Sequence, residues 1–238
     1  MHSPCRLAIF IVLLISSGIN AQVVDEESHD ASKWAEAIIA FEKLDAEQSP
    51  PKNAILFVGS SSIRFWDLKA SFPELDAINR GFGGSQMADS VFYVQQLVLK
   101  HDPKSVVVYA GDNDIAKGKS PERVFADFAE FVAILTKELP NAQIHYVAVK
   151  PSIKRWNLID KIRFTNQLIE AYCETHERLH FVDIGGGMLM DDGKPNPDMF
   201  VKDGLHLNKL GYESWTKKVL ESLECESREL QPTQTDIP

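Results

Sequence analysis

Short apolar runs alternate with longer amphipathic stretches along most of this chain. Residues 55–58 (Ile-Leu-Phe-Val) form the first run, which has no polar alternation and is typical of a strand buried on both faces of a parallel sheet. The same pattern recurs at four later places, residues 77–80, 105–111, 143–149 and 180–184. The pattern therefore predicts five buried strands.

The stretches between these runs have helical periodicity. In the first of them Trp34, Ile38, Phe41 and Leu44 recur at helical spacing, which predicts an amphipathic helix over residues 31–47. Further helices are expected at residues 85–100, 121–139, 158–177 and 209–223. Regular alternation of strand and helix indicates an α/β fold, a three-layer α/β/α sandwich around a five-stranded parallel sheet.

The two ends of the chain differ in character from this middle part. Arg6, the apolar residues 7–15 and the small-residue stretch that ends at Ala21 predict a signal peptide over residues 1–21. The alternative is an uncleaved membrane anchor, although the apolar run is short for a bilayer. A polar leader (22–30), one domain (31–225) and a flexible tail (226–238) are expected to follow, in a secreted or periplasmic protein.

Composition excludes some partners. The net charge of −9 over 238 residues and the lack of a Lys/Arg cluster argue against nucleic-acid binding. Once the signal is removed, nothing predicts stable membrane insertion, and the oligomeric state stays open.

Cys5 leaves with the signal, whereas Cys173 and Cys225 remain. An exported protein permits a disulfide between them, which the sequence leaves open.

The most informative residues directly follow the predicted strands. They are Gly59-Ser60-Ser61-Ser62, residues 79–85, Gly111-Asp112-Asn113-Asp114, Lys150-Pro151-Ser152 and, after a long loop, residues 203–208. The carboxyl ends of parallel strands share one edge of the sheet, and ligands bind at that edge. Residues far apart in the sequence are therefore expected to meet there.

These residues suit acyl transfer, which needs a nucleophile, a base, a group that orients the base, and oxyanion donors. A serine after the first strand is the candidate nucleophile, and Asp203 three residues before His206 can hold the imidazole. The Asn113 amide and the backbone N–H of Gly84 are candidate donors. The plainer alternatives are helix-capping serines, turn and loop residues, or a metal site, for which no third ligand is evident.

Three familiar motifs are not matched. Gln86 stands where a dinucleotide-binding loop would have its third glycine, and Ile63 breaks the nucleophile-elbow pattern. No phosphate-binding loop of the Walker type is present. These departures argue against a dinucleotide enzyme, a nucleotide-binding enzyme and the usual α/β-hydrolase arrangement.

The ordered blocks Gly59-Ser60-Ser61, Gly84, 111–114 and 203–206 resemble the SGNH (GDSL-type) hydrolase superfamily over residues 55–215. The opening Phe-Val-Gly-Ser-Ser-Ser-Ile is most similar to platelet-activating-factor acetylhydrolase-like esterases. The resemblance implies a flavodoxin-like fold and a serine esterase that needs no cofactor and no metal. By position it makes Ser61 the nucleophile, His206 the base, Asp203 its partner, and Ser61, Gly84 and Asn113 the oxyanion hole.

One position departs from this superfamily, whose first block reads Gly-Asp-Ser, because Ser60 replaces the aspartate. This leaves three consecutive serines as candidates, and the register from Gly59 favours Ser61. The expected substrate is a small ester with a short, acetyl-type acyl group, and an acetylated carbohydrate is one candidate. A lysophospholipase or thioesterase, or a catalytically silent binding homologue, is the alternative.

The loop of residues 185–202 is too long for a simple connection and is expected to shape the substrate pocket. Its apolar residues Met188, Met199 and Phe200 are candidates for contact with the substrate, together with Trp66, Phe82 and Trp156 from other loops. The alternative is that these side chains only cover the edge of the sheet.

Overall fold

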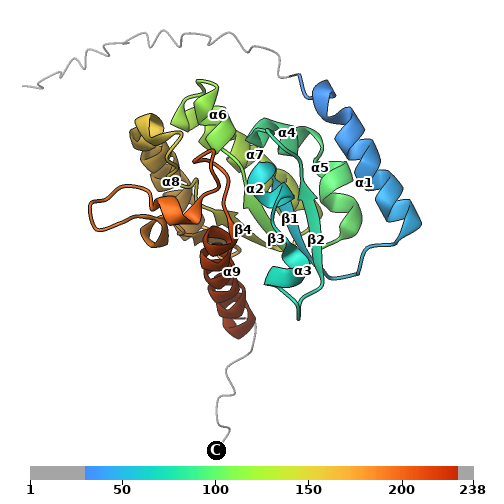
Figure 1. Cartoon of the computed structure of the whole chain (residues 1–238). Coiled ribbons are helices and arrows are strands. Elements are labelled where there is room, and N and C mark those ends of the chain that lie inside the picture. The colour runs from blue at the N-terminus through green and yellow to red at the C-terminus, as the bar shows by residue number, and fades with distance from the viewer. Residues whose placement is uncertain (1–29, 230–238) are drawn as a thin grey trace, which may run out of the picture. The chain divides into compact units, whose positions relative to one another are not determined.

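The computed structural model describes residues 30–229, with side chains as far as residue 224. Its centre is a five-stranded sheet in the order β2-β1-β3-β4-β5, and every neighbouring pair is parallel (Figure 1). The strands are β1 (Ile55–Gly59), β2 (Ala77–Gly81), β3 (Ser105–Tyr109), β4 (Gln143–Val147) and β5 (Leu179–Val182). The predicted five-stranded parallel sheet is confirmed.

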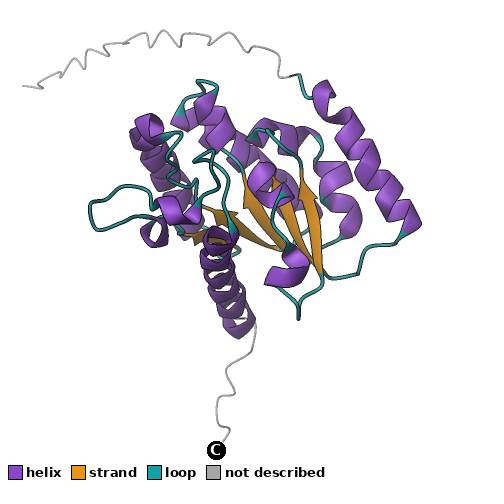
Figure 2. Ribbon diagram, viewed as in Figure 1, coloured by secondary structure: helices purple, strands orange, loops and turns teal. Residues whose placement is uncertain are grey.

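Helices cover both faces of the sheet (Figure 2), because alternate residues of each buried strand point to opposite faces. Leu56 and Val58 of β1 belong to one core cluster and Ile55 and Phe57 to the other. The first cluster packs under α1 (Ala35–Glu47), α4 (Met87–Phe92), α5 (Val94–Leu97), α7 (Pro121–Glu138) and α8 (Ile159–Glu174); the second packs under α3 (Leu68–Ser71) and α9 (Lys209–Glu229). The three-layer α/β/α sandwich is confirmed.

Short helices that the pattern did not predict lie mostly at the ends of strands and in loops. α2 (Ser61–Arg64) follows β1 directly, and α6 (Asp112–Ala116) follows β3. The remaining turns are 3-10 helices at Ser32–Trp34, Leu99–His101, Trp156–Leu158, Gly186–Met188 and Pro197–Met199. They are too short for periodicity to reveal, and α2 and α6 carry the candidate site residues Ser61 and Asn113.

Two expected helices differ from the prediction. The expected helix at residues 85–100 is broken into α4, α5 and a 3-10 turn, and Val94, Leu97 and Val98 lie in the core. α9 continues past the expected end at residue 223 to Glu229, into the expected tail. The remainder of that tail and the predicted signal peptide lie outside the described residues.

A tight turn leads from β1 into the candidate site. Gly59 has φ +136°, and a Cβ at this position would lie 1.9 Å from the Tyr109 carbonyl oxygen of β3. Only glycine permits this approach. Gly59 is also in register with Gly81 and Tyr109, so the segments after β1, β2 and β3 begin at the same level of the sheet.

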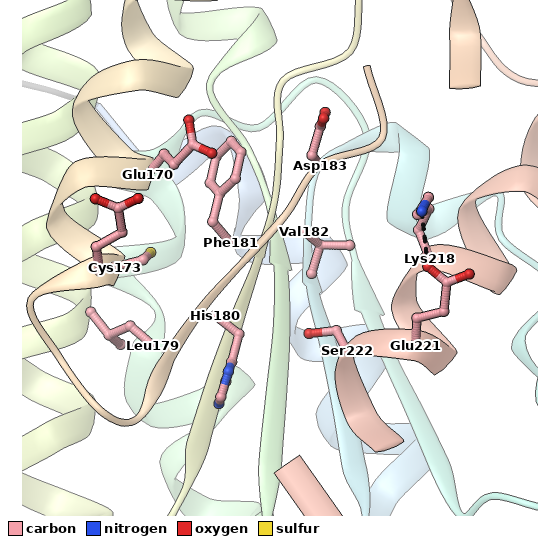
Figure 3. A pocket seen from close by; sticks show the side chains of 11 residues that line it. Glu170, Cys173, Leu179, His180, Phe181, Val182, Asp183, Lys218, Glu221 and Ser222 are labelled. Carbon is pink, nitrogen blue, oxygen red and sulfur yellow. Dashed lines mark hydrogen bonds and ion pairs between the residues drawn. The ribbon is translucent and has the colours of Figure 1, made fainter. Parts of the chain in front are cut away.

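Strand β5 is the edge of the sheet on the side of α8 and α9. A cavity of about 510 Å³ lies along it, between Glu170 and Cys173 of α8 and Lys218 and Ser222 of α9 (Figure 3). A second cavity of about 220 Å³ continues past Phe181 toward the carboxyl end of β4. Ser61 and His206 line neither cavity.

Candidate active site

The carboxyl edge of the sheet brings the predicted site residues together. Ser61 opens α2 after β1, Gly84 lies in the turn after β2, and Asn113 is in α6 after β3. His206 comes from the loop between β5 and α9, 145 positions along the chain from Ser61, yet their side chains are in hydrogen-bond contact. The convergence expected from the strand ends is therefore present.

The side chains of Ser61, His206 and Asp203 form a continuous chain of contacts. His206 Nε2 lies 3.0 Å from Ser61 Oγ, and His206 Nδ1 lies 2.6 Å from Asp203 Oδ2. A carboxylate only accepts hydrogen bonds, so it holds the imidazole proton on Nδ1. Nε2 is then free to accept the proton of the serine hydroxyl.

Asp203 is held in place by its own loop. Its Oδ1 accepts hydrogen bonds from the backbone N–H groups of Leu205 (2.8 Å) and His206 (2.9 Å). Burial opposes ionisation, but the hydrogen bonds from His206 and Leu205 outweigh it and lower the pKa of Asp203 to about 2. Asp203 therefore stays ionised at neutral pH.

Asn208 anchors this loop to the helix that follows. Its Oδ1 accepts a hydrogen bond from the Gly211 N–H in the first turn of α9. Its Nδ2 donates to the carbonyls of Asp198 (2.7 Å) and Phe200 (3.2 Å). Asn208 thus caps α9 and fixes the chain two residues after the imidazole.

Three N–H donors are available beside the serine. The backbone N–H groups of Ser61 and Gly84 have no acceptor within residues 30–229. Asn113 Nδ2 donates one hydrogen to the Ser85 carbonyl at 2.9 Å, and its second hydrogen stays available. Gly84 has φ +81°, and the Trp34 ring lies 3.3 Å from the position of a Cβ there, so a larger residue would be strained and crowded.

Several candidate substrate contacts lie elsewhere than the sequence suggested. Trp66 and Phe82 are only 2% exposed, and Phe200 is also buried in the core. Trp66 packs against Phe57, Phe72, Tyr212 and Trp215. These three aromatic residues therefore belong to the core and do not face a substrate, because large apolar side chains next to a sheet edge gain more from burial.

The remaining predicted contacts come from loops. Met188 is buried, and Met199 packs against the core under α9. Trp156 is half-buried in a 3-10 turn, with the Arg163 guanidinium 5.9 Å from its ring centroid. None of these side chains has a contact with Ser61 or His206 among the interactions of the described residues.

Other side chains, which the sequence reasoning missed, flank the imidazole. Phe65 is 54% exposed, and its ring meets the His206 ring edge to face at 5.2 Å. Ile153 is also exposed and lies 3.2 Å from the position of a Cβ on Gly204, in the loop of Asp203 and His206. Phe65 and Trp66 are consecutive in the sequence, which does not reveal which of the two rings faces the site.

No group of three or more His, Cys, Asp or Glu side chains within residues 30–229 is arranged to hold a metal ion.

Cys173 is a buried free thiol. Its pKa is raised to about 12, mainly by burial and then by Glu170. The side chain of Cys225 lies outside the described residues. Within residues 30–229, no helix has the length and apolar character needed to cross a membrane.

Comparison with known proteins agrees with this geometry. Residues 61–213 match the model of the GDSL-like lipase/acylhydrolase family. The chain belongs to this family. It is therefore an ester hydrolase of the GDSL type, and its relatives include the bovine platelet-activating factor acetylhydrolase IB subunit alpha1, 30% identical over 177 residues, which are 71% of this chain and 73% of the relative.

Solved structures share the fold of this GDSL hydrolase. A GDSL-like lipase from Bacteroides thetaiotaomicron superposes with a TM-score of 0.69 at 20% identity, over 83% of this chain and 98% of the other. A family 3 carbohydrate esterase from Clostridium thermocellum superposes with a TM-score of 0.61 at 12% identity, over 76% and 100%. At such low identity these likenesses concern the fold alone.

Proposed function

We propose that this GDSL hydrolase is an exported serine esterase that removes short, acetyl-type acyl groups from a small ester, through an acyl-enzyme on Ser61. The observation that carries the proposal is the aligned chain of Ser61 Oγ, His206 and Asp203, with contacts of 3.0 and 2.6 Å. The export is supported only by the apolar N-terminal segment of the sequence.

The first half of the reaction forms the acyl-enzyme. His206 Nε2 takes the proton of Ser61 as Oγ attacks the ester carbonyl carbon, and the carbonyl oxygen becomes an oxyanion. The free N–H groups of Ser61 and Gly84 and the second amide hydrogen of Asn113 stabilise that charge. The imidazolium, stabilised by Asp203, then donates its proton to the leaving alcohol.

The second half returns the enzyme to its starting state. Water enters in place of the alcohol, His206 takes a proton from it, and the resulting hydroxide attacks the acyl carbon. A second oxyanion forms at the same donors and collapses, which releases the carboxylic acid and gives the proton back to Ser61. No step needs a metal or a cofactor.

Two features favour a short acyl group. The Trp34 ring lies 3.3 Å from the position of a Cβ on Gly84, which limits the space beside this oxyanion donor. The name of one relative, an acetylhydrolase subunit, points the same way. The exposed ring of Phe65 beside His206 offers a flat apolar face to a leaving group such as a sugar.

Hydrolysis of p-nitrophenyl esters of increasing chain length tests this proposal. We expect the highest kcat/KM for acetate, inactivation by a serine-directed phosphonate, and no loss of activity with a chelator. Acetate release from acetylated sugars would extend the result to carbohydrate. A preference for octanoate or longer chains would favour a lysophospholipase or thioesterase instead, and absence of any turnover would favour the silent binding homologue.

The oxyanion donors provide a second test. Asn113→Ala should lower kcat by about 10²- to 10³-fold, the usual effect of one lost donor, with KM nearly unchanged. Thermal unfolding serves as the control, because Asn113 also bonds to the Ser85 carbonyl. A loss of activity that merely follows a loss of folded protein would assign Asn113 to the turn alone.

A further inference from the structure

Three charged side chains beside Asn113 have no part in the mechanism above. Lys150 follows β4 and has a side chain only 1% exposed, and Asp112 follows β3 with a side chain only 5% exposed. Arg155 lies five positions beyond Lys150, with 15% of its side chain exposed. Burying such groups is costly unless they are paired, so their arrangement calls for an explanation.

Both cations meet the same carboxylate oxygen. Asp112 Oδ2 lies 3.2 Å from Lys150 Nζ and 2.9 Å from Arg155 Nη1. Burial alone would raise the pKa of Asp112, but the charges of Lys150 and Arg155 outweigh it and lower that pKa. With one carboxylate between two cations, the cluster has a net positive charge.

The cluster connects two turns of the candidate site. Lys150 Nζ donates to Ser62 Oγ at 3.0 Å and to the Tyr109 hydroxyl at 2.9 Å, and Ser62 is the neighbour of Ser61. On the other side, Arg155 Nη2 donates to Asn113 Oδ1 at 2.8 Å. The nucleophile turn and the amide of Asn113 are thus tied to one buried group of charges.

The contact with Arg155 decides which way the Asn113 amide faces. A guanidinium has donors and no acceptor, so it can bond only to the amide oxygen. The Ser85 carbonyl, an acceptor, takes one hydrogen of Nδ2 at 2.9 Å. With both partners in place the amide cannot turn over, and its second N–H hydrogen is left for the oxyanion.

We propose that Arg155 is a positioning residue for ester hydrolysis. The Asp112–Lys150 pair holds its guanidinium, and the guanidinium orients the Asn113 amide toward the oxyanion. Its positive charge also polarises this amide, which strengthens the N–H as a donor. The proposal rests on the esterase function proposed above. Arg155 itself does not touch the reacting atoms.

A double-mutant cycle in the full-length protein tests this role. Arg155→Gln should lower kcat about 10- to 100-fold, the scale of one charged hydrogen bond, with KM changed less than about 3-fold. In the Asn113→Ala background the same substitution should cost less than about 3-fold, because residues that act as a unit are not additive. Arg155→Lys should recover part of the rate, since it keeps the charge without the planar fork.

The matched control is Arg163→Gln, which removes an exposed guanidinium of α8 that packs over Trp156. It should leave kcat within about 2-fold of the wild type. The side-chain amide resonances of Asn113 give a readout independent of turnover, and they should shift in Arg155→Lys but not in Arg163→Gln. If Arg155→Gln fails to fold, these resonances still test whether Arg155 acts on the Asn113 amide.

Two results would overturn the inference. An Arg155→Gln enzyme as active as the wild type would remove any role for this guanidinium, and an equal loss with and without Asn113 would show that it does not act through the amide. Failure of the underlying function is distinguishable, because the wild-type enzyme would then hydrolyse no ester at all.

Discussion

Two acid–base pairs lie at the same edge of the sheet and differ in almost every respect. Asp203 and His206 are three positions apart in one loop, and 38% and 27% of their side chains are exposed. Lys150 and Asp112 come from the ends of two strands, 38 positions apart, and are almost completely buried. In the proposed reaction the imidazole of the first pair gains and loses a proton, whereas the second pair takes no part in proton transfer.

The difference follows from what each pair has to do. A general base must reach substrate and solvent and must change its protonation state during turnover. A group that positions others needs a constant charge and several fixed partners, which a buried pair provides. Exposure therefore distinguishes the Asp203–His206 pair, which is proposed to transfer protons, from the Lys150–Asp112 pair, which is proposed to hold other groups in position. Consecutive serines join them, since Ser61 contacts His206 and Ser62 contacts Lys150.

The largest expected effect separates these two serines. Ser61→Ala should lower kcat by on the order of 10³-fold or more, because it removes the nucleophile. Ser62→Ala should keep most of the activity and lose about 1–3 kcal/mol of unfolding free energy, since Lys150 loses a buried partner. Ester hydrolysis and urea unfolding measure both quantities. An inactive Ser62→Ala variant together with an active Ser61→Ala variant would make Ser62 the nucleophile.

The same substitution in each acid should have opposite consequences. Asp203→Asn should lower kcat about 10³-fold with little loss of stability, because the carboxylate is partly exposed but holds the imidazole. Asp112→Asn should cost about 3–5 kcal/mol of unfolding free energy, since it leaves two cations without their buried counter-charge. Unfolding curves and kcat for both variants check this. Equal losses of stability in the two variants would contradict the comparison.

Sequence reasoning predicted the exposed pair and missed the buried one for a physical reason. Asp203 and His206 are close in sequence, and a loop three residues long brings them together without any knowledge of the fold. Lys150, Asp112 and Arg155 meet only because β3 and β4 are adjacent in the sheet. The order of strands, which the hydrophobic pattern does not contain, decides that contact.

The fold itself was largely predictable, and the substrate surface was not. All five strands were predicted from the sequence, although only β1 and β3 are almost continuously apolar and β2 contains Asn79 and Arg80. Whether an aromatic side chain beside the site faces the core depends on the local turn. The one-turn helix α2 points Trp66 inward and Phe65 outward, and a helix of one turn has no periodicity to detect.

A pH series should separate the two pairs without mutation. kcat/KM should rise with pH as His206 loses its proton, because only the neutral imidazole accepts the proton of Ser61. Asp203→Asn should lower the whole profile about 10³-fold, because the imidazole is then no longer held for proton transfer. A profile that does not depend on Asp203 would argue against the pair.

Stability should respond to pH in a different, acidic window. The pKa of Asp203 is lowered to about 2 and that of Asp112 is lowered as well. A carboxyl with a lowered pKa contributes stability that is complete above its unfolded pKa, near 3.9, and is lost as the pH falls toward its folded pKa. Unfolding free energy should therefore decline below about pH 4, well below the range in which activity changes. Coincident declines of stability and activity would mean that one group governs both.

The smallest effect is expected at Ser60, which belongs to neither pair. Its backbone holds the turn: the N–H donates to the Tyr109 carbonyl at 3.0 Å, and the carbonyl accepts from Ile63 and Arg64. Its hydroxyl oxygen is buried and has no hydrogen-bond partner within residues 30–229. Ser60→Ala keeps the backbone bonds and removes only this unpaired group. We expect kcat to stay within about 2-fold and the unfolding free energy to be unchanged or raised by up to about 1 kcal/mol. A loss of activity as large as that of Ser61→Ala, measured on the same ester, would move the nucleophile to the position of the family's aspartate.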